Sequence, residues 1–299
     1  MTQHVFGAIV TANGTAANNR GLTEGNTTTL QKLIWSGQVH TTVSAESIRF
    51  ALRRRLAESE ETNRTYNETE RVNEWKDDKF ARWSDKEQAP FIDDDILGFM
   101  AAEGAKQDGG KGNAKVRRAV LEIARAVSLT PWPGDVTFNA ASPGATPSAQ
   151  KRGSNPVPYA TEMHATRYQY GFAMTPTRLR VPARAATALR GLCALGEVAG
   201  NHGRFLFDFS PDAIVVRITD DPAPRLLYGF SLDDDGQLSI SEILRRTRAK
   251  DIGAEELVLG GAIIGLLSEK DREVLRGAEL HEGVRAACES ACKRLKASA

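Results

Sequence analysis

The chain has 299 residues, of which 41% are hydrophobic, so it can bury the core of one large domain or two small ones. A formal net charge of +1 excludes a strongly basic or acidic protein, so any polyanion must bind to a local surface. The charge is uneven: residues 1–56 carry a net +4, 57–110 a net −8, 111–184 a net +8 and the remainder a net −3. These blocks predict either solvated acidic helices or surfaces through which copies of the chain attract one another.

The start of the chain predicts a strand over residues 3–12, then a long polar loop rich in Asn, Gly and Thr. Ser44 is the predicted N-cap of an amphipathic helix over 45–58, with basic residues on one side. A polar glycine-containing loop that leads into a helix N-terminus suits an anion, because backbone N–H groups and the helix dipole point to the same place.

Residues 59–111 are charged and contain scattered aromatic residues, which indicates an inserted, mostly helical lobe. Val116, Val120, Ile123 and Val127 have helical spacing and predict a helix over 114–128. A strand is predicted at 135–140, a protruding Pro-, Ser- and Gly-rich loop at 141–159, and a strand at 160–174.

The rest of the chain predicts further helices and strands. These are a helix at 182–199, strands at 204–209 and 213–219, an alternating segment at 239–250, a Gly-broken apolar stretch at 256–267, and helices near 268–276 and 281–296. The core order is strand, helix, strand, strand, helix, strand. This is an α+β fold of ferredoxin-like type, which the RNA-recognition motif also uses and which many functions share.

Cys193, Cys288 and Cys292 lack the spacing of a disulfide framework, which favours a reducing compartment. The chain starts without a signal peptide, and no apolar run approaches the ~18 residues of a membrane helix. We therefore predict a cytoplasmic protein with no membrane contact. Cys288 and Cys292 lie four residues apart near His281 without the spacing of a zinc site and are expected to be buried in a helix, and we expect no metal and no cofactor. The Asp triplets at 93–95 and 233–235 are expected to be solvated loops rather than Mg²⁺ sites.

Four segments carry a family resemblance: AsnAsnArgGly at 18–21, GlyAsn at 25–26, LeuGlnLys at 30–32 and ValSerAlaGluSerIleArg at 43–49. They resemble the backbone subunit of the Cascade effector complex of CRISPR systems, and the closest branch is the DevR family of type I-B and I-A systems. The resemblance implies a modified RNA-recognition fold shaped like a hand. Its palm would be residues 1–58 plus 131–299, with a helical finger lobe at 59–130 and a thumb hairpin at 141–159.

The resemblance also implies a non-enzymatic subunit. Its copies would polymerise head to tail along a guide CRISPR RNA, and each thumb would push one nucleotide out of the stack. Target DNA and the other Cascade subunits are the further partners that it implies. The predicted guide-RNA contacts around the first loop and helix are Asn18, Asn19, Arg20, Gly21, Asn26, Lys32, Ser44, Glu46, Arg49 and Arg53.

Arg, Lys and backbone N–H groups hold phosphates whatever the base sequence, as a subunit that carries every guide requires. Glu46 stands where relatives often carry Gln, so a ribose 2′-OH or a neighbouring Arg is its expected partner. At the thumb, Lys151 and Arg152 are candidate nucleic-acid contacts, and Met163 is a candidate wedge beside a kinked nucleotide. His202 precedes a predicted strand and either touches RNA or belongs to a turn.

The aromatic residues at 167–172 fit either a base-stacking platform or a sheet core, and the core is favoured. Two other functions stay open. A metal-dependent ribonuclease of type III-like kind would use an Asp in residues 11–44, which contain no Asp and one acidic residue, Glu24. A stand-alone regulatory protein would bind no nucleic acid.

Overall fold

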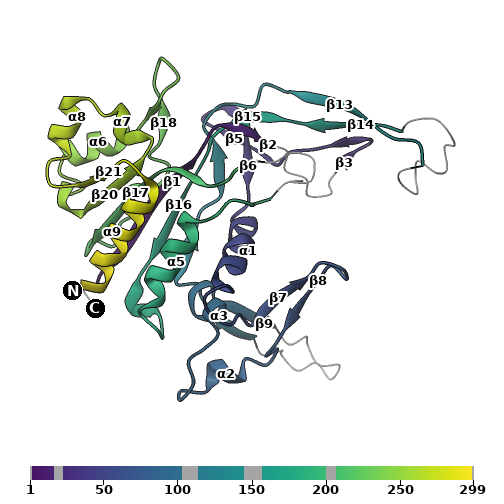
Figure 1. Cartoon of the computed structure of the whole chain (residues 1–299), viewed down its shortest axis with the longest axis horizontal. Coiled ribbons are helices and arrows are strands. Elements are labelled where there is room, and N and C mark those ends of the chain that lie inside the picture. The colour runs from purple at the N-terminus through teal and green to yellow at the C-terminus, as the bar shows by residue number, and fades with distance from the viewer. Residues whose placement is uncertain (1, 17–22, 103–113, 145–156, 200–206, 298–299) are drawn as a thin grey trace.

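A large central sheet organises the part of the chain that the computed structural model describes, namely residues 2–16, 23–102, 114–144, 157–199 and 207–297 (Figure 1). Within these residues the sheet has nine strands, of which eight follow one path and the ninth pairs beside it. In spatial order they are β21 (Glu279–His281), β20 (Leu257–Gly261), β17 (Pro211–Thr219), β1 (His4–Thr11), β16 (Tyr168–Met174), β12 (Ala126–Ser128), β6 (Gln38–Val43) and β5 (Lys32–Trp35), and β11 (Leu121–Ile123) also pairs with β16. The predicted first strand is confirmed.

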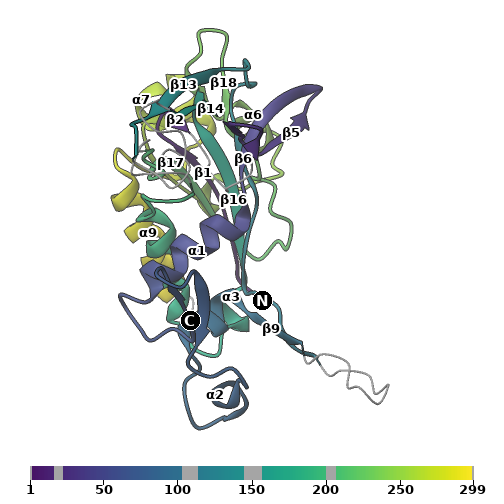
Figure 2. The same cartoon turned by 90° about the vertical axis from the view of Figure 1, so that its right-hand side faces the viewer.

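The sheet is buried on both faces because the alternating side chains of β1 enter two different apolar clusters. Val5 and Ile9 pack with helices α1 (Ala45–Leu56), α5 (Arg184–Cys193) and α9 (Val284–Ala297). Phe6, Ala8 and Val10 pack on the opposite face. The helices of that second face are α6 (Ser241–Arg248), α7 (Ile263–Leu266) and α8 (Glu269–Val274), and Figure 2 shows helices α1 and α9 on the first face.

The centre of the sheet has two crossover connections. Helix α1 lies between β1 and the strands β11 and β12 in sequence, and helix α5 lies between β16 and β17. The four central strands stand in the order β17-β1-β16-β12. Strand β1 is antiparallel to both neighbours, so that Ile9 lies opposite Tyr170 on one side and Ile214 on the other.

The inserted lobe is built mainly from hairpins, so the prediction of a mostly helical lobe is wrong for its described residues. Strand β7 (Arg64–Asn67) pairs with β8 (Val72–Trp75), and β9 (Phe99–Ala102) pairs with β10 (Ala114–Arg117). The lobe's helices are short: α2 (Ala81–Ser84) and α3 (Ile92–Leu97). The predicted helix over 114–128 is also wrong, because this segment forms β10, β11 and β12. Its β-branched residues fit strand pairing with β9, β16 and β6 as well as they fit a helical period.

The Asp93–Asp95 triplet is buried, at 2%, 2% and 0% exposure, so the expected solvated loop is wrong here. Asp93 accepts hydrogen bonds from the backbone N–H groups of Asn63 (2.7 Å) and Arg64 (3.1 Å). Asp95 accepts from Arg184 Nη1 at 3.1 Å. These bonds tie the lobe to helix α5, which is the reason that three carboxylates can be buried together. The second triplet, at 233–235, is exposed in a turn, as expected.

A thin sheet projects from the central one and forms the long arm in Figure 1. It contains β13 (Val136–Ala141), β14 (Val157–Glu162), β4 (Thr27–Thr28) and β3 (Thr23–Glu24), in that order. At its base, β15 (His164–Thr166) pairs with β2 (Gly14–Ala16). The strand predicted at 135–140 is confirmed, and the one predicted at 160–174 is divided into β14, β15 and β16.

The C-terminal part matches the predicted helices at 268–276 and 281–296 and the strand at 213–219. The alternating pattern predicted at 239–250 is wrong for most of this segment, because helix α6 covers Ser241–Arg248 after a small hairpin of β18 (Ser231–Leu232) and β19 (Leu238–Ser239). Two 3-10 turns lie at Pro176–Arg178 and Ala254–Glu256. Of the strand predicted at 204–209, residues 207–209 are irregular. Cys288 and Cys292 are buried, as expected. Within the described ranges, no helix has both the length and the apolarity needed to cross a bilayer.

Candidate nucleic-acid interface

The N-terminus of helix α1 has the predicted cap. Ser44 has an extended backbone (φ −70°, ψ 149°), and its Oγ accepts a hydrogen bond from the Ser47 N–H at 3.2 Å. Ser44 is buried and caps the start of helix α1, so its side chain serves the helix N-terminus and does not face a ligand. Glu46 is exposed on the first turn.

Arg49 and Arg53 face the inserted lobe. Arg49 donates to the Leu97 carbonyl, and Arg53 Nε lies 3.1 Å from Asp93 Oδ2. Arg53 is only 8% exposed. Burial, followed by the positive charge of Arg64, lowers the pKa of Arg53 to about 10. Both arginines therefore hold helix α1 against helix α3 and its surroundings, and Arg49 is the more accessible of the two.

The loop after β1 and the arm strands β13 and β14 form one sheet. Asn26 Nδ2 donates to the Pro158 carbonyl at 3.0 Å, and the Ala160 N–H donates to the Asn26 carbonyl at 3.0 Å. Thr27 then pairs with Ala160 in a parallel register. Two segments separated by more than a hundred residues, both predicted to contact RNA, are thereby brought side by side.

Lys32 lies at the base of this arm and already has partners. Its Nζ is 2.6 Å from Glu162 Oε2 and 4.0 Å from the centroid of the Trp132 ring. Glu162 also accepts from the Leu30 N–H at 2.7 Å. A phosphate at Lys32 would have to compete with this carboxylate, which lowers the expected contribution of Lys32 to RNA affinity.

Met163 is packed within the base of the arm. It is 7% exposed, and its carbonyl accepts a hydrogen bond from Trp132 Nε1 at 2.8 Å. In this conformation it does not project from the surface. The remaining predicted contacts lie outside the described residues: Asn18, Asn19, Arg20, Gly21, Lys151, Arg152 and His202.

A buried hydrogen-bond network at the base of the arm was not predicted from the sequence. The Thr41 hydroxyl lies 2.7 Å from both His164 Nδ1 and the Tyr168 hydroxyl. Thr130 Oγ1 is 3.1 Å from His164 Nε2. Burial lowers the pKa of His164, which favours the neutral ring. The sequence carried only part of the signal, because His164 and Tyr168 lie in the strand predicted at 160–174 but Thr41 and Thr130 lie outside every predicted strand.

The aromatic residues of β16 belong to the core. Tyr168, Tyr170 and Phe172 are each 0–1% exposed. This confirms the favoured interpretation over a base-stacking platform. No group of three or more His, Cys, Asp or Glu side chains within the described residues is arranged to hold a metal ion.

Comparison with known proteins places the chain in a family. The model of the family described as CRISPR-associated negative auto-regulator DevR/Csa2 matches residues 6–237. The chain belongs to the DevR/Csa2 family. A relative from Myxococcus xanthus (strain DK1622), named CRISPR-associated protein Cas7/Cst2/DevR, is 68% identical over 298 residues, which is 99% of each chain.

Solved structures share the fold of this DevR/Csa2-family chain. A chain of a CRISPR RNA-guided surveillance complex in a pre-nicking state has a TM-score of 0.63 at 12% identity, covering 98% of this chain and 100% of that chain. Another CRISPR RNA-guided surveillance complex contains a chain with a TM-score of 0.56 at 16% identity, covering 97% and 99%. The family resemblance found in the sequence is confirmed. Cas7/DevR backbone proteins are non-catalytic, which agrees with the prediction that the chain is not an enzyme.

Proposed function

We propose that this DevR/Csa2-family chain is a Cas7-type backbone subunit that polymerises along a guide CRISPR RNA and supports its pairing with target DNA. We infer that β1, α1, β12, β16, α5 and β17 form the modified RNA-recognition core predicted from the sequence, because they have its order and connectivity. The inserted hairpin lobe would then be the finger lobe, and the arm of β13 and β14 would be the thumb.

The observation that carries this proposal is the shared sheet of the β1 loop and the arm. Asn26 and Thr27 are hydrogen-bonded to the strand that leads out of the 141–159 thumb segment. This sheet joins the described ends of the two segments in which Arg20 and the Lys151–Arg152 pair are predicted from the sequence to hold phosphates. Contacts of this kind do not depend on the base sequence.

The predicted basic contacts therefore have different proposed roles. Arg20, Lys151 and Arg152 are assigned to phosphates, and Arg49 joins them from helix α1. Arg53 is assigned to holding the lobe, because its guanidinium is buried against Asp93. Lys32 is partly neutralised by Glu162 and is assigned a smaller share.

Self-association would use surfaces of opposite charge and exposed apolar side chains. Ile34 on β5 and Phe138 on β13 are 78% and 77% exposed, which is unusual for residues of this size. A head-to-tail contact between unlike surfaces builds an open filament when its rotation does not close. Successive copies along one guide RNA are such a filament, with other Cascade subunits at its ends.

The test is co-expression with a CRISPR RNA, followed by purification and titration with single-stranded RNA at several salt concentrations. Arg20→Ala is expected to weaken binding for every base sequence and to reduce the salt slope by about one. Arg118→Ala is the matched control, because Arg118 is exposed and pairs with Glu122 within its own segment. Binding by Arg20→Ala that equals the wild type in affinity and salt slope would contradict the assignment of Arg20.

The family description names auto-regulation, which favours one second candidate, a stand-alone regulator. The ratio of absorbance at 260 to 280 nm after purification from the native host separates the two. A nucleic-acid-rich ratio supports the backbone subunit, and a protein-like ratio supports the regulator.

A further inference from the structure

A hollow lies between helix α1 and the β7–β8 hairpin. Figure 1 shows these two elements below the arm. Its volume is about 190 Å³. Phe50 and Arg54 line it from the helix, and Arg64 and Tyr66 line it from the hairpin. We call it the α1–hairpin pocket. None of these four residues belongs to the RNA contacts predicted from the sequence.

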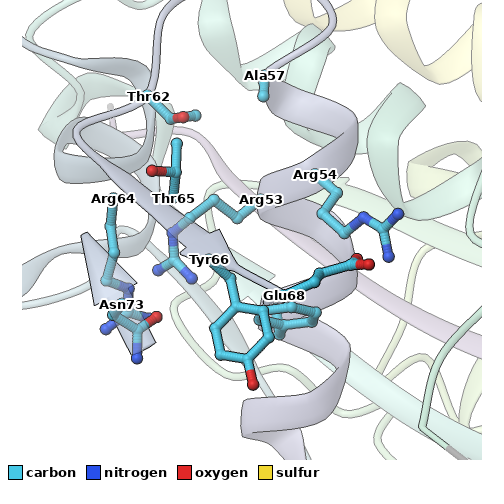
Figure 3. A pocket seen from close by; sticks show the side chains of 10 residues that line it. Arg53, Arg54, Ala57, Thr62, Arg64, Thr65, Tyr66, Glu68 and Asn73 are labelled. Carbon is cyan, nitrogen blue, oxygen red and sulfur yellow. The ribbon is translucent and has the colours of Figure 1, made fainter. Parts of the chain in front are cut away.

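The pocket has more positive than negative charge, because Arg53, Arg54 and Arg64 line it together with one acidic residue, Glu68. Arg53 is paired with Asp93, but among the described residues neither Arg54 nor Arg64 forms an ion pair. Arg64 Nε is buried and has no hydrogen-bond partner. Figure 3 shows the Arg53, Arg54 and Arg64 side chains around the same hollow, with Asn73 beside Arg64. A buried donor without a partner and adjacent guanidinium groups favour an anionic ligand.

The pocket also has exposed aromatic surface. Phe50 and Tyr66 are 37% and 41% exposed, and their rings meet edge to face with centroids 5.5 Å apart. Aromatic rings beside arginines bind single-stranded nucleic acid, because every base has a face that stacks and every phosphate has a charge. A carboxylate of a peptide would satisfy the arginines but would leave the two rings uncovered.

The pocket opens toward the proposed path of the guide. A second hollow shares Phe50, Arg54, Arg64 and Asn73 with it and continues to Glu46 and Ser47 on the first turn of α1. A strand at that helix terminus therefore has a continuous surface into the α1–hairpin pocket. Cavities of about 150 Å³ hold a benzene ring, so a volume of about 190 Å³ accepts a planar base.

We propose that the α1–hairpin pocket binds one nucleotide of a single-stranded nucleic acid, with its base against Tyr66 and Phe50 and its phosphate at Arg54 and Arg64. Glu68 and Asn73 also line the pocket or its continuation. The Glu68 carboxylate only accepts hydrogen bonds, so it faces the N–H edge of the base and not the phosphate. This inference rests on the proposed function, because it adds a second contact to the same bound strand.

The test measures binding of the full chain to three fluorescein-labelled hexamers: a uridylate RNA, a thymidylate DNA and an abasic ribose phosphate of the same length. The variants are Tyr66→Ala, Tyr66→Phe, Arg64→Gln and the control Arg55→Ala. Arg55 lies next to Arg54 but pairs with Glu58 on the exposed side of the helix. Thermal unfolding midpoints establish that each variant folds, and Tyr66→Ala is tolerated best because Tyr66 is half-exposed.

We expect the wild type to bind the uridylate hexamer more tightly than the abasic one. Tyr66→Ala is expected to lose about five- to 150-fold in affinity for the uridylate hexamer and to bind both RNAs alike. Arg64→Gln is expected to lower the salt slope by about one. Tyr66→Phe keeps the ring and Arg55→Ala keeps the pocket, so both should bind as the wild type does. The ratio of RNA to DNA affinity then assigns the pocket to the guide or to the target strand.

Equal binding of the uridylate hexamer by Tyr66→Ala and the wild type would overturn the pocket and leave the proposed function intact. Failure of the wild type to bind any of the three hexamers would instead count against the proposed function. Loss of self-association in Tyr66→Ala with RNA affinity unchanged would assign this surface to a second copy of the chain and also overturn the proposal.

Discussion

Asp94 is a buried carboxyl group at which a conservative change is expected to alter stability in a pH-dependent way. It is 2% exposed, and its Oδ2 accepts a hydrogen bond from Asn63 Nδ2 at 3.0 Å. Burial, followed by the negative charge of Asp93, raises the pKa of Asp94 from 3.8 to about 7. Asp94→Asn keeps the size and an acceptor oxygen for Asn63 but removes the titrating group.

The sign of the effect follows from proton binding. Between pH 3.8 and about 7 the folded protein binds the Asp94 proton and the unfolded chain does not, so this carboxyl stabilises the fold less as pH rises. The interval from 3.8 to about 7, at about 1.4 kcal/mol for each pH unit, corresponds to at most about 4 kcal/mol. At pH 8 the Asp94→Asn variant should therefore be more stable than the wild type by on the order of 2–4 kcal/mol, while near pH 4 the two should be close.

The assay is urea unfolding followed by tryptophan fluorescence at pH 4.5, 6 and 8, with the free energy of unfolding compared between variant and wild type. Asp233→Asn serves as a control for the same chemical change in an exposed turn. A variant that is less stable than the wild type by the same amount at all three pH values would refute the reasoning. That result would mean that Asp94 is ionised in the folded protein throughout this range.

Two further predictions concern the packing of the lobe and the base of the arm. Gly98 has φ +67°, and a Cβ there would lie 2.2 Å from the Arg117 carbonyl oxygen. Gly98→Ala should therefore lower the free energy of unfolding by at least about 2 kcal/mol, measured by denaturant unfolding. A stability equal to the wild type would contradict the close approach of the two segments. The pKa of His164 is lowered by burial, so the neutral ring contributes stability that is present above pH 6.5 and is lost as pH falls below it. The stability difference between the wild type and His164→Gln should therefore shrink from pH 7.5 to pH 5.5, and a constant difference would show that His164 is not buried as a neutral ring.

The elements that the sequence predicted correctly are those that local sequence signals determine. The first strand and helix α1 follow from an apolar alternation and from the Ser44 cap, and both are local signals. The family followed from the residues at 18–53, because they form a specific pattern around one loop and the helix after it.

The inserted lobe was predicted poorly because its structure depends on distant partners. Val116, Val120 and Ile123 have helical spacing, but β10, β11 and β12 pair with strands elsewhere in the chain. The buried Asp93–Asp95 triplet depends on Arg53, on Arg184 and on backbone donors at 63–64 and 180–181, and no local pattern reveals such partners. The α1–hairpin pocket was missed for the same reason, since Arg64 and Tyr66 meet helix α1 only after the hairpin folds back.

The most direct test of the central claim is nuclease protection of a CRISPR RNA that is bound by this chain alone, at low ionic strength and increasing protein concentration. The account predicts protection that extends along the RNA in steps of a fixed number of nucleotides, whatever the spacer sequence, and that fails to extend with Arg20→Ala. Protection confined to one sequence, or an RNA that stays fully accessible at saturating folded protein, would contradict it.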